Sequence, residues 1–156
     1  MAEAEFMRRA IALSLEMMRS GRGGPFGAVI VKDGKIIAEG FSQVTSLNDP
    51  TAHGEVVAIR AACQALQTFD LAGTEIYSSC EPCPMCLSAI YWARISKLYF
   101  ANDCVDAAKV GFRDDFLYQE IPLPLDQRSI PTIRLLPKEG WAAFEEWMNK
   151  PDKVDY

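Results

Sequence analysis

The stretch GTEIYSSCEPCPMCLSAIYWARISKLYFA, residues 73–101, decides the fold. Its two ends, residues 73–79 and 96–101, are short runs rich in β-branched and aromatic residues, which is typical of strands. The residues between them predict a helix that begins just after the first strand, with Pro82 near its first position. A strand, a helix and a second strand in this order indicate an α/β domain.

The residues before this stretch continue the alternation toward the amino terminus. Apolar residues recur there at helical spacing, at Phe6, Ala10, Leu13 and Met17. They predict an amphipathic helix over about residues 4–20. The runs FGAVIVK (26–32) and KIIAEGF (35–41) predict two strands, and the Asp33-Gly34 dipeptide between them favours a tight hairpin turn.

Three further helices and one strand complete the pattern. SLNDP (46–50) reads as a loop, and Asp49 or Thr51 is the expected cap of a helix over about residues 52–67. In the last third, residues 106–121 predict a helix that Gly111 interrupts. Residues 130–136 fit a fifth strand, and residues 139–150 predict a closing helix. Strands alternating with helices predict a sheet covered on both faces, in one domain spanning residues 1–156.

Composition narrows the classes of function. The formal net charge of −5 argues against broad binding to a nucleic-acid backbone, which requires a basic surface. No apolar run approaches the roughly 18–20 residues of a membrane span, and the start MAEAEFMRRA, which lacks an apolar stretch, is not expected to act as a signal peptide. We therefore expect a cytoplasmic protein without membrane contact. Its five cysteines, an odd number, favour metal or thiol chemistry over a disulfide framework.

The chain contains a single histidine, His53, and Glu55 follows two positions later. A lone histidine is most often a surface or core residue, but both of these residues fall in the first turn of a predicted helix. Cys83 and Cys86 fall at the start of another helix, after a strand. One histidine and two cysteines match the ligands of a catalytic zinc, which keeps its fourth position open for water.

A zinc ion in such a set makes hydroxide available at neutral pH. Glu55 is surplus to the ligands and is expected to transfer the proton. The same Cys-x-x-Cys also describes a thiol-redox centre, and Cys80 or Cys104 could complete a structural zinc site. The combined His-x-Glu and Pro-Cys-x-x-Cys pattern favours the catalytic reading, with one zinc per chain.

The segments His53-Gly54-Glu55 and PCPMC (82–86) resemble the signature of the zinc-dependent nucleobase and nucleoside deaminases. The resemblance to the bacterial guanine deaminases among them extends along nearly the whole chain. It is carried by GGPFGAVIVKDG, NDPTAH, EIYSSCEPCPMCLSAIYWAR, GFRDDF and the terminal tyrosine. It implies a cytidine deaminase-like, three-layer α/β/α sandwich with a mixed sheet of about five strands. It also implies hydrolytic loss of ammonia from an amino-substituted ring, most naturally conversion of guanine to xanthine.

The resemblance assigns further residues to the site. It implies that Phe26 stacks on the base, that Asp114 and Tyr156 contact the substrate, and that Trp92 belongs to the same set, although core packing is an equal reading for Trp92. In the family, Asp114 and Tyr156 arrive with a C-terminal segment, here about residues 138–156, that is exchanged between the subunits of a homodimer. The expected partners are therefore a small nucleobase and a second copy of the chain.

Two positions depart from the family pattern. Gly54 stands where alanine is usual, although its backbone N–H remains available to a substrate, and fungal cytosine deaminases share His-Gly-Glu. Ser42 stands where the family places an asparagine that binds the base, and Gln43 is expected to face the other way. Other aminated rings, such as cytosine, isoguanine or a triazine, therefore remain open. So do a tRNA adenosine deaminase, disfavoured by the acidic C-terminal third, and a non-enzymatic zinc or thiol-redox module.

Overall fold

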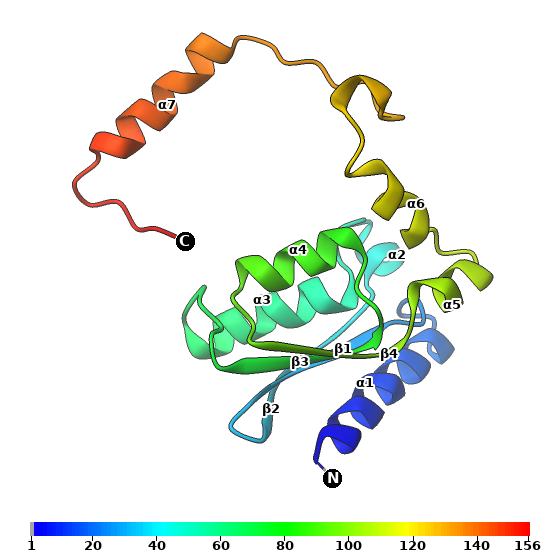
Figure 1. The fold of residues 1–156 in the computed structure, drawn as a ribbon. Helices are drawn as coiled ribbons and strands as arrows, with labels where there is room; N and C mark the ends of the chain where they lie inside the picture. Colours follow the sequence, from blue (N-terminus) through cyan, green and yellow to red (C-terminus); the bar gives the residue numbers. More distant parts are fainter. Residues whose placement is uncertain (1) are drawn as a thin grey trace.

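The computed structural model describes residues 2–156 and contains one mixed sheet of four strands in the order β2-β1-β3-β4 (Figure 1). The strands are β1 (Gly27–Lys32), β2 (Lys35–Phe41), β3 (Thr74–Cys80) and β4 (Lys97–Asn102). β1 is antiparallel to β2 and β3, whereas β3 and β4 are parallel and are joined through a helix. The helices are α1 (Ala2–Arg19), α2 (Val44–Leu47), α3 (Gly54–Leu66), α4 (Pro84–Trp92), α5 (Cys104–Lys109), α6 (Asp114–Glu120), the 3₁₀ turn η1 (Leu125–Gln127) and α7 (Pro137–Asn149).

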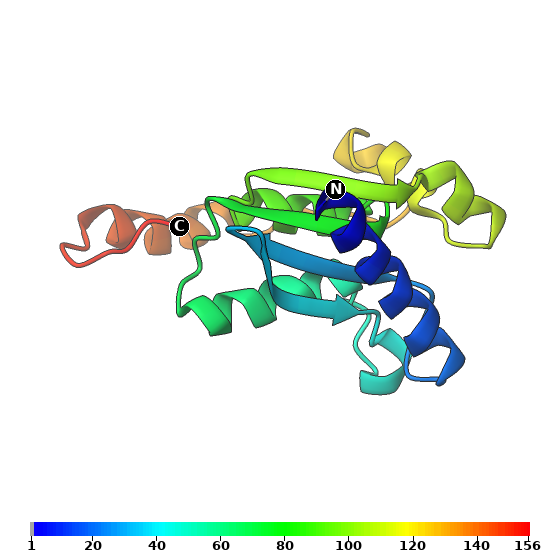
Figure 2. The same ribbon diagram turned by 90° about the horizontal axis from the view of Figure 1, so that it is seen from below.

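The sheet separates two layers of helices, as Figures 1 and 2 show: α1 covers one face, and α3 and α4 cover the other. Alternate residues of a strand point to opposite faces. Val29, Val31 and Tyr77 therefore pack toward α1, whereas the neighbouring residues Ile30 and Ile76 pack toward α3 and α4. The predicted three-layer α/β/α sandwich is confirmed.

Two glycines allow the helices to lie close against the sheet. A Cβ on Gly40 would lie 2.5 Å from the backbone nitrogen of Ala58 in α3. A Cβ on Gly27 would lie 2.9 Å from the Cβ of Leu13 in α1. The absence of a side chain at each strand position therefore sets the distance between the layers.

The turns and caps both confirm and correct the sequence predictions. Asp33 and Gly34 have φ of 50° and 73°, the two positive values that the predicted tight hairpin turn requires. The predicted caps of α3 were wrong, because His53 is its N-cap and Asp49 instead accepts hydrogen bonds from the backbone and hydroxyl of Thr51. Likewise α4 begins at Pro84 with Cys83 as its N-cap, rather than near Pro82.

The predicted fifth strand was wrong for the single chain. Residues 130–136 form no strand, and Ile133 and Leu135 are 83% and 78% exposed. Beyond α6 the chain leads away from the sheet, so this run has no strand of its own chain beside it (Figure 1).

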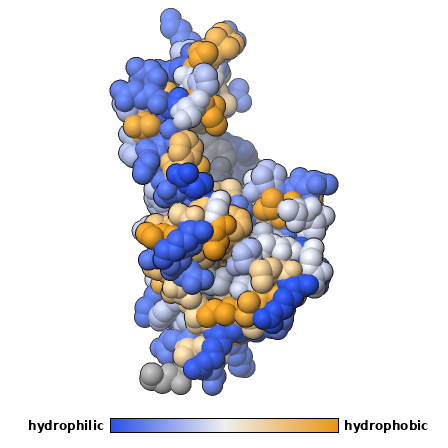
Figure 3. Space-filling view, turned by 90° about the vertical axis from the view of Figure 1, so that its right-hand side faces the viewer, coloured by the Kyte–Doolittle hydropathy of each residue, from blue (hydrophilic) through white to orange (hydrophobic). Residues whose placement is uncertain are grey.

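The residues that follow α6, 121–156, form what we call the C-terminal arm. In Figure 1 the arm leaves the layered body at α6, carries α7 at a distance from it, and ends near the body. Apolar residues stay at the surface along the arm, and Figure 3 shows apolar side chains exposed on both the body and the part that projects from it. Within residues 2–156, no helix combines the length and apolar character needed to cross a bilayer.

Candidate active site

His53, Cys83 and Cys86 come together although 30 residues separate the first two. His53 Nδ1 lies 3.6 Å from the sulfur of Cys83 and 3.5 Å from that of Cys86. His53 is the N-cap of α3 and Cys83 the N-cap of α4, so two adjacent helix starts present the three side chains. All three ligand atoms lie within 4.8 Å of one another, as a single metal ion requires.

The electrostatics of the cluster suit a cation. The pKa of Cys83 falls to about 4, because the Cys86 side chain and then His53 form hydrogen bonds that favour its thiolate. The pKa of Cys86 is raised, first by its hydrogen bond to Cys83 and then by burial. A second thiolate beside the first is disfavoured unless positive charge balances it, and one nitrogen and two thiolates are the donor set that zinc prefers. The residues therefore fit the expected zinc.

Neither alternative fourth ligand belongs to the cluster. The Cys80 side chain donates a long hydrogen bond, 3.9 Å, to the carbonyl oxygen of Asp103, and burial raises the pKa of its thiol to about 12. The backbone N–H of Cys104 donates to the carboxylate of Glu81. The described metal-ligand group contains only His53, Cys83 and Cys86, which leaves room for a fourth ligand that is not protein.

Glu55 lies beside the cluster, in the first turn of α3, and is only 7% exposed. Burial is the main reason that the pKa of its carboxyl is raised. Its Oε1 accepts a hydrogen bond of 2.9 Å from the hydroxyl of Ser78 in β3. A buried carboxyl group of raised pKa is suited to exchange protons near neutral pH.

His53, Cys83 and Glu55 line one cavity of about 280 Å³, whereas Cys86 is buried behind it. The cavity brings together three other predicted site residues, Phe26, Ser42 and Asp114, and Gly54 begins α3 beside it. Sequence reasoning missed the remaining lining residues, which are Gly24, Val44, Thr45, Cys80, Glu81 and Phe112. They come from loops, from α2 and from the end of β3, and the quoted family segments contain Gly24, Cys80, Glu81 and Phe112 but gave none of them a role in binding the substrate.

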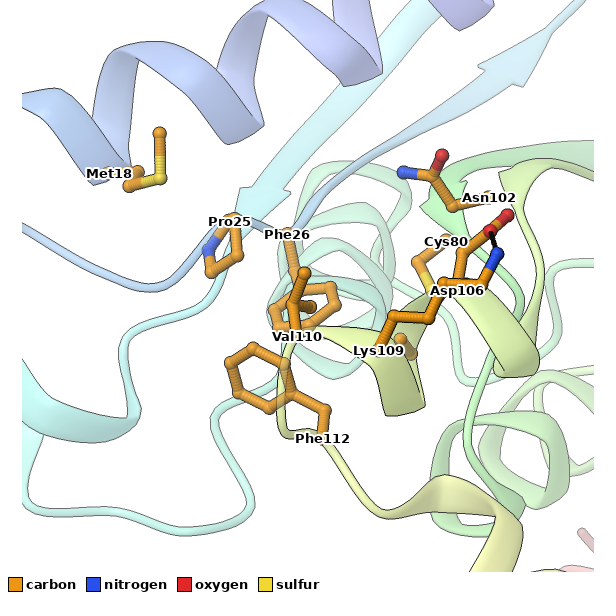
Figure 4. A pocket seen from close by; sticks show the side chains of 10 residues that line it. Met18, Pro25, Phe26, Cys80, Asn102, Asp106, Lys109, Val110 and Phe112 are labelled. Atoms are coloured by element: carbon orange, nitrogen blue, oxygen red, sulfur yellow. Dashed lines mark hydrogen bonds and ion pairs between the residues drawn. The ribbon is translucent and has the colours of Figure 1, made fainter.

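Phe112 forms an aromatic wall of the cavity together with Phe26. Their rings meet edge to face, with centroids 4.7 Å apart, and Figure 4 shows both rings side by side. Gly111, at φ of 96°, ends α5, and the N–H of Phe112 then donates to the carbonyl of Ala107. This C-terminal turn directs Phe112 back toward Phe26. The pair also lines a second cavity of about 610 Å³, which Figure 4 shows with Met18 and Lys109 among its other lining residues.

The remaining predicted residues lie at two different places. Asp114 lines the cavity of its own chain from the start of α6, so it does not arrive with an exchanged segment as expected. Trp92 and Tyr156 do not line this cavity but lie against each other at the C-terminal end of α4, with ring centroids 6.2 Å apart. Within one chain, the structure does not bring these two aromatic residues to the cluster.

Comparison with known proteins connects this site to a family. Residues 1–102 match the family model of the cytidine and deoxycytidylate deaminase zinc-binding region. The chain belongs to this deaminase family. A guanine deaminase of Bacillus subtilis (strain 168) is 51% identical over 151 residues, which cover 97% of each chain.

Further relatives of this deaminase support the assignment. The crystal structure of a guanine deaminase from Bacillus subtilis matches with a TM-score of 0.95 and 50% identity, covering 98% of each chain. A tRNA-specific adenosine deaminase of Agrobacterium fabrum is 49% identical over only 76 residues, 49% of this chain and 50% of its own. The deaminase is thus a zinc-dependent aminohydrolase, as the sequence predicts, and its similarity to guanine deaminases includes the arm.

Proposed function

We propose that this deaminase converts guanine to xanthine and ammonia. The observation that carries the proposal is that the His53–Cys83–Cys86 cluster and the buried Glu55 meet at one cavity with an aromatic wall, which His53, Cys83 and Glu55 line. The guanine deaminase that shares 51% of its residues with the chain supports guanine among the possible rings. The tRNA-specific relatives support it less, because the one described above matches only half of the chain.

In this proposal His53, Cys83 and Cys86 hold the zinc. Zinc held by these donors would lower the pKa of water and so supply hydroxide at neutral pH. The Glu55 carboxylate takes a proton from the attacking water and delivers it to the ring nitrogen next to the amino-bearing carbon. It then takes the remaining proton of the added hydroxyl group and gives it to the amino nitrogen. The carbon–nitrogen bond breaks, ammonia leaves, and the oxygen stays on the ring as a carbonyl.

Four residues are proposed to orient the base. The ring of Phe26 stacks on it, and a fifth residue, Phe112, supports that ring from the side without contacting the base. The hydroxyl of Ser42 and the backbone N–H of Gly54 offer hydrogen bonds to the base, and the carboxylate of Asp114 binds an amino group. The pKa of Asp114 is raised, first by burial and then by the Cys83 thiolate, which suits a group that also exchanges a proton.

The active form is proposed to be a homodimer that exchanges its C-terminal arms. Trp141 and Phe144 of α7 are 53% and 65% exposed, so the arm leaves apolar surface without a partner in its own chain. Tyr156 lies outside the cavity of its own chain, whereas an exchanged arm would bring it to the partner's cavity as a lid.

We place this enzyme in the cytoplasm, because the cluster requires two unoxidised thiols and all five cysteines are free.

Ammonia release from a panel of free bases and nucleosides by the zinc-loaded enzyme tests the proposal. Guanine should be the preferred substrate, and omission of zinc after chelation should abolish release. Preference for cytosine, isoguanine, a triazine or a nucleoside would overturn guanine as the substrate but would not contradict the proposed hydrolytic mechanism.

The Ser42→Asn variant in the same panel tests the base-binding position. If the parent is slow with guanine, one further hydrogen bond, worth about 1–3 kcal/mol, should raise its turnover.

A further inference from the structure

Two neighbouring serines at the end of β3, Ser78 and Ser79, use their hydroxyls for contacts far away in the sequence. Both side chains are buried, each only 2% exposed. Ser78 contacts Glu55, 23 residues earlier, and Ser79 contacts Gly27, 52 residues earlier. Adjacent strand residues point in opposite directions, so this dipeptide reaches two different parts of the site.

Ser78 holds one oxygen of the proton-transferring carboxylate. Its hydroxyl donates to Oε1 of Glu55 at 2.9 Å, in a fully buried setting. A hydrogen bond to a carboxylate in such a place is stronger and more directional than one in water. Because the bond occupies Oε1, it fixes the rotation of the carboxylate and determines which oxygen faces the cavity.

Ser79 holds the backbone that carries the stacking ring. Its Oγ accepts the N–H of Gly27 at 3.0 Å, where the antiparallel pairing of β1 with β3 has ended at Ala28 and Ser78. Phe26, directly before Gly27, is further held by its N–H, which donates to Gly24, and by its carbonyl, which accepts from Ser42. The Ser79 contact therefore adds a third point at which the Phe26 segment is fixed.

We propose that Ser78 and Ser79 are positioning residues that act through different groups: Ser78 through the Glu55 carboxylate and Ser79 through the Phe26 ring. The proposal rests on the proposed function for the roles of those two groups. Its consequence is a division of kinetic effects. Loss of the Ser78 hydroxyl disturbs the reacting carboxylate and lowers kcat, whereas loss of the Ser79 hydroxyl loosens the stacking platform and raises KM.

The test compares Ser78→Ala and Ser79→Ala in the zinc-loaded enzyme. We expect Ser78→Ala to lower kcat by roughly tenfold or more with little change of KM, the size expected for a lost hydrogen bond to a charged group. Ser79→Ala should raise KM several-fold with little change of kcat. Ser14→Ala is the matched control, because Ser14 is a buried serine of α1 whose hydroxyl donates only to the local carbonyl of Ile11.

A double-mutant cycle separates positioning from general packing. In the Glu55→Gln background, Ser78→Ala should cost little further in kcat, because the group through which Ser78 acts is already lost. Ser78→Thr, which restores a hydroxyl, should recover most of the rate. Equal multiplicative losses in both backgrounds, or equal effects of the two alanine variants on kcat and KM, would overturn the proposal.

Crystal structures of the parent and Ser78→Ala provide a readout that needs no substrate. The carboxylate of Glu55 should rotate or become disordered in Ser78→Ala while zinc and the backbone stay in place. An unmoved carboxylate overturns the role of Ser78 even if guanine proves not to be the substrate. Absence of guanine turnover in the parent, with the carboxylate displaced in the variant, would instead contradict only the proposed function.

Discussion

The layered body and the C-terminal arm differ in how far their apolar side chains are buried. In the body, Tyr77 is 1% exposed and stacks on Tyr99 with ring centroids 4.4 Å apart. In the arm, Ile133 is 83% exposed and Phe144 65% exposed, although both are as apolar as residues of the core. Burial of apolar surface stabilises a fold by about 25 cal/mol per Å². The core of the body buries its apolar side chains within one chain, although Trp92 stays 68% exposed at its surface, whereas the arm has no core of its own. The arm therefore needs a second surface, which supports the proposed exchange.

The catalytic groups belong to the body, so the largest effect is expected there. Glu55→Gln should lower kcat by about 10² or more, because it removes the proton carrier while keeping a side chain of the same shape. Zinc content and thermal unfolding should match the parent. Glu145→Gln in α7 is the control in the arm and should leave kcat unchanged. A Glu55→Gln enzyme within a few-fold of the parent would show that Glu55 does not transfer the proton.

Deletion of the C-terminal tail should lower turnover without changing the stability of the body. Removal of residues 150–156, which follow α7, takes away the ring and hydroxyl of Tyr156. We expect a fall in kcat/KM of roughly tenfold, the loss of one aromatic contact with its hydrogen bond. Zinc content and the unfolding temperature of the body should stay the same.

Mixing this truncated chain with the Glu55→Gln chain examines the exchange itself. If arms are exchanged, mixed dimers contain one site with an intact Glu55 and a Tyr156 from the other chain, so part of the activity should return. Full activity of the truncated chain alone would make the tail dispensable. A loss without recovery on mixing would indicate a lid that closes on its own subunit.

Substitutions at two glycines test how closely the helices pack against the sheet of the body. Gly40→Ala should lower the free energy of unfolding by about 1–3 kcal/mol, because its Cβ meets the backbone of α3. At Gly54 an added Cβ would have ordinary contacts of 3.4 Å and more. Gly54→Ala should therefore keep activity and stabilise by about 0.4–1 kcal/mol, by restricting the unfolded chain. Urea denaturation measures both, and equal effects would contradict the packing argument.

The smallest effect is expected from the ion pair between Arg9 in α1 and Glu39 in β2. The guanidinium forms two hydrogen bonds with the carboxylate, at 2.7 and 2.8 Å, and this holds the pKa of Glu39 below its usual value. Both side chains are more than a third exposed, so Arg9→Met should cost only about 0.2–1 kcal/mol at neutral pH.

The pH dependence of that cost follows from the lowered pKa. A carboxyl group whose pKa is depressed by folding stabilises the fold above its unfolded pKa of about 4.3 and loses that contribution as the pH falls. The difference in unfolding free energy between Arg9→Met and the parent should therefore shrink as the pH falls from 7 to 3. A difference that is constant between these pH values would assign the effect to the aliphatic part of Arg9 instead.

The sequence by itself determined the order of the elements of the body and the metal-ligand residues. Helical and strand periodicity, and the turn at Asp33-Gly34, depend on residues only a few positions apart, so local patterns contain them. The ligand motifs were readable for the same reason, since His53 and Glu55 share one helical turn and Cys83 and Cys86 another. The N-cap residues of the helices were predicted less well, because several neighbouring residues can bind the same backbone groups.

Only the tertiary structure decided which distant groups meet. Nothing near Ser78 in the sequence marks Glu55 as its partner, and nothing near Phe112 marks Phe26, because each contact depends on how whole layers pack. The predicted strand at 130–136 fits a local pattern, but a strand needs a neighbour for its backbone hydrogen bonds, and the path of the arm removes that neighbour within one chain. Local sequence describes what a segment can form, whereas packing and pairing decide whether it forms and against what.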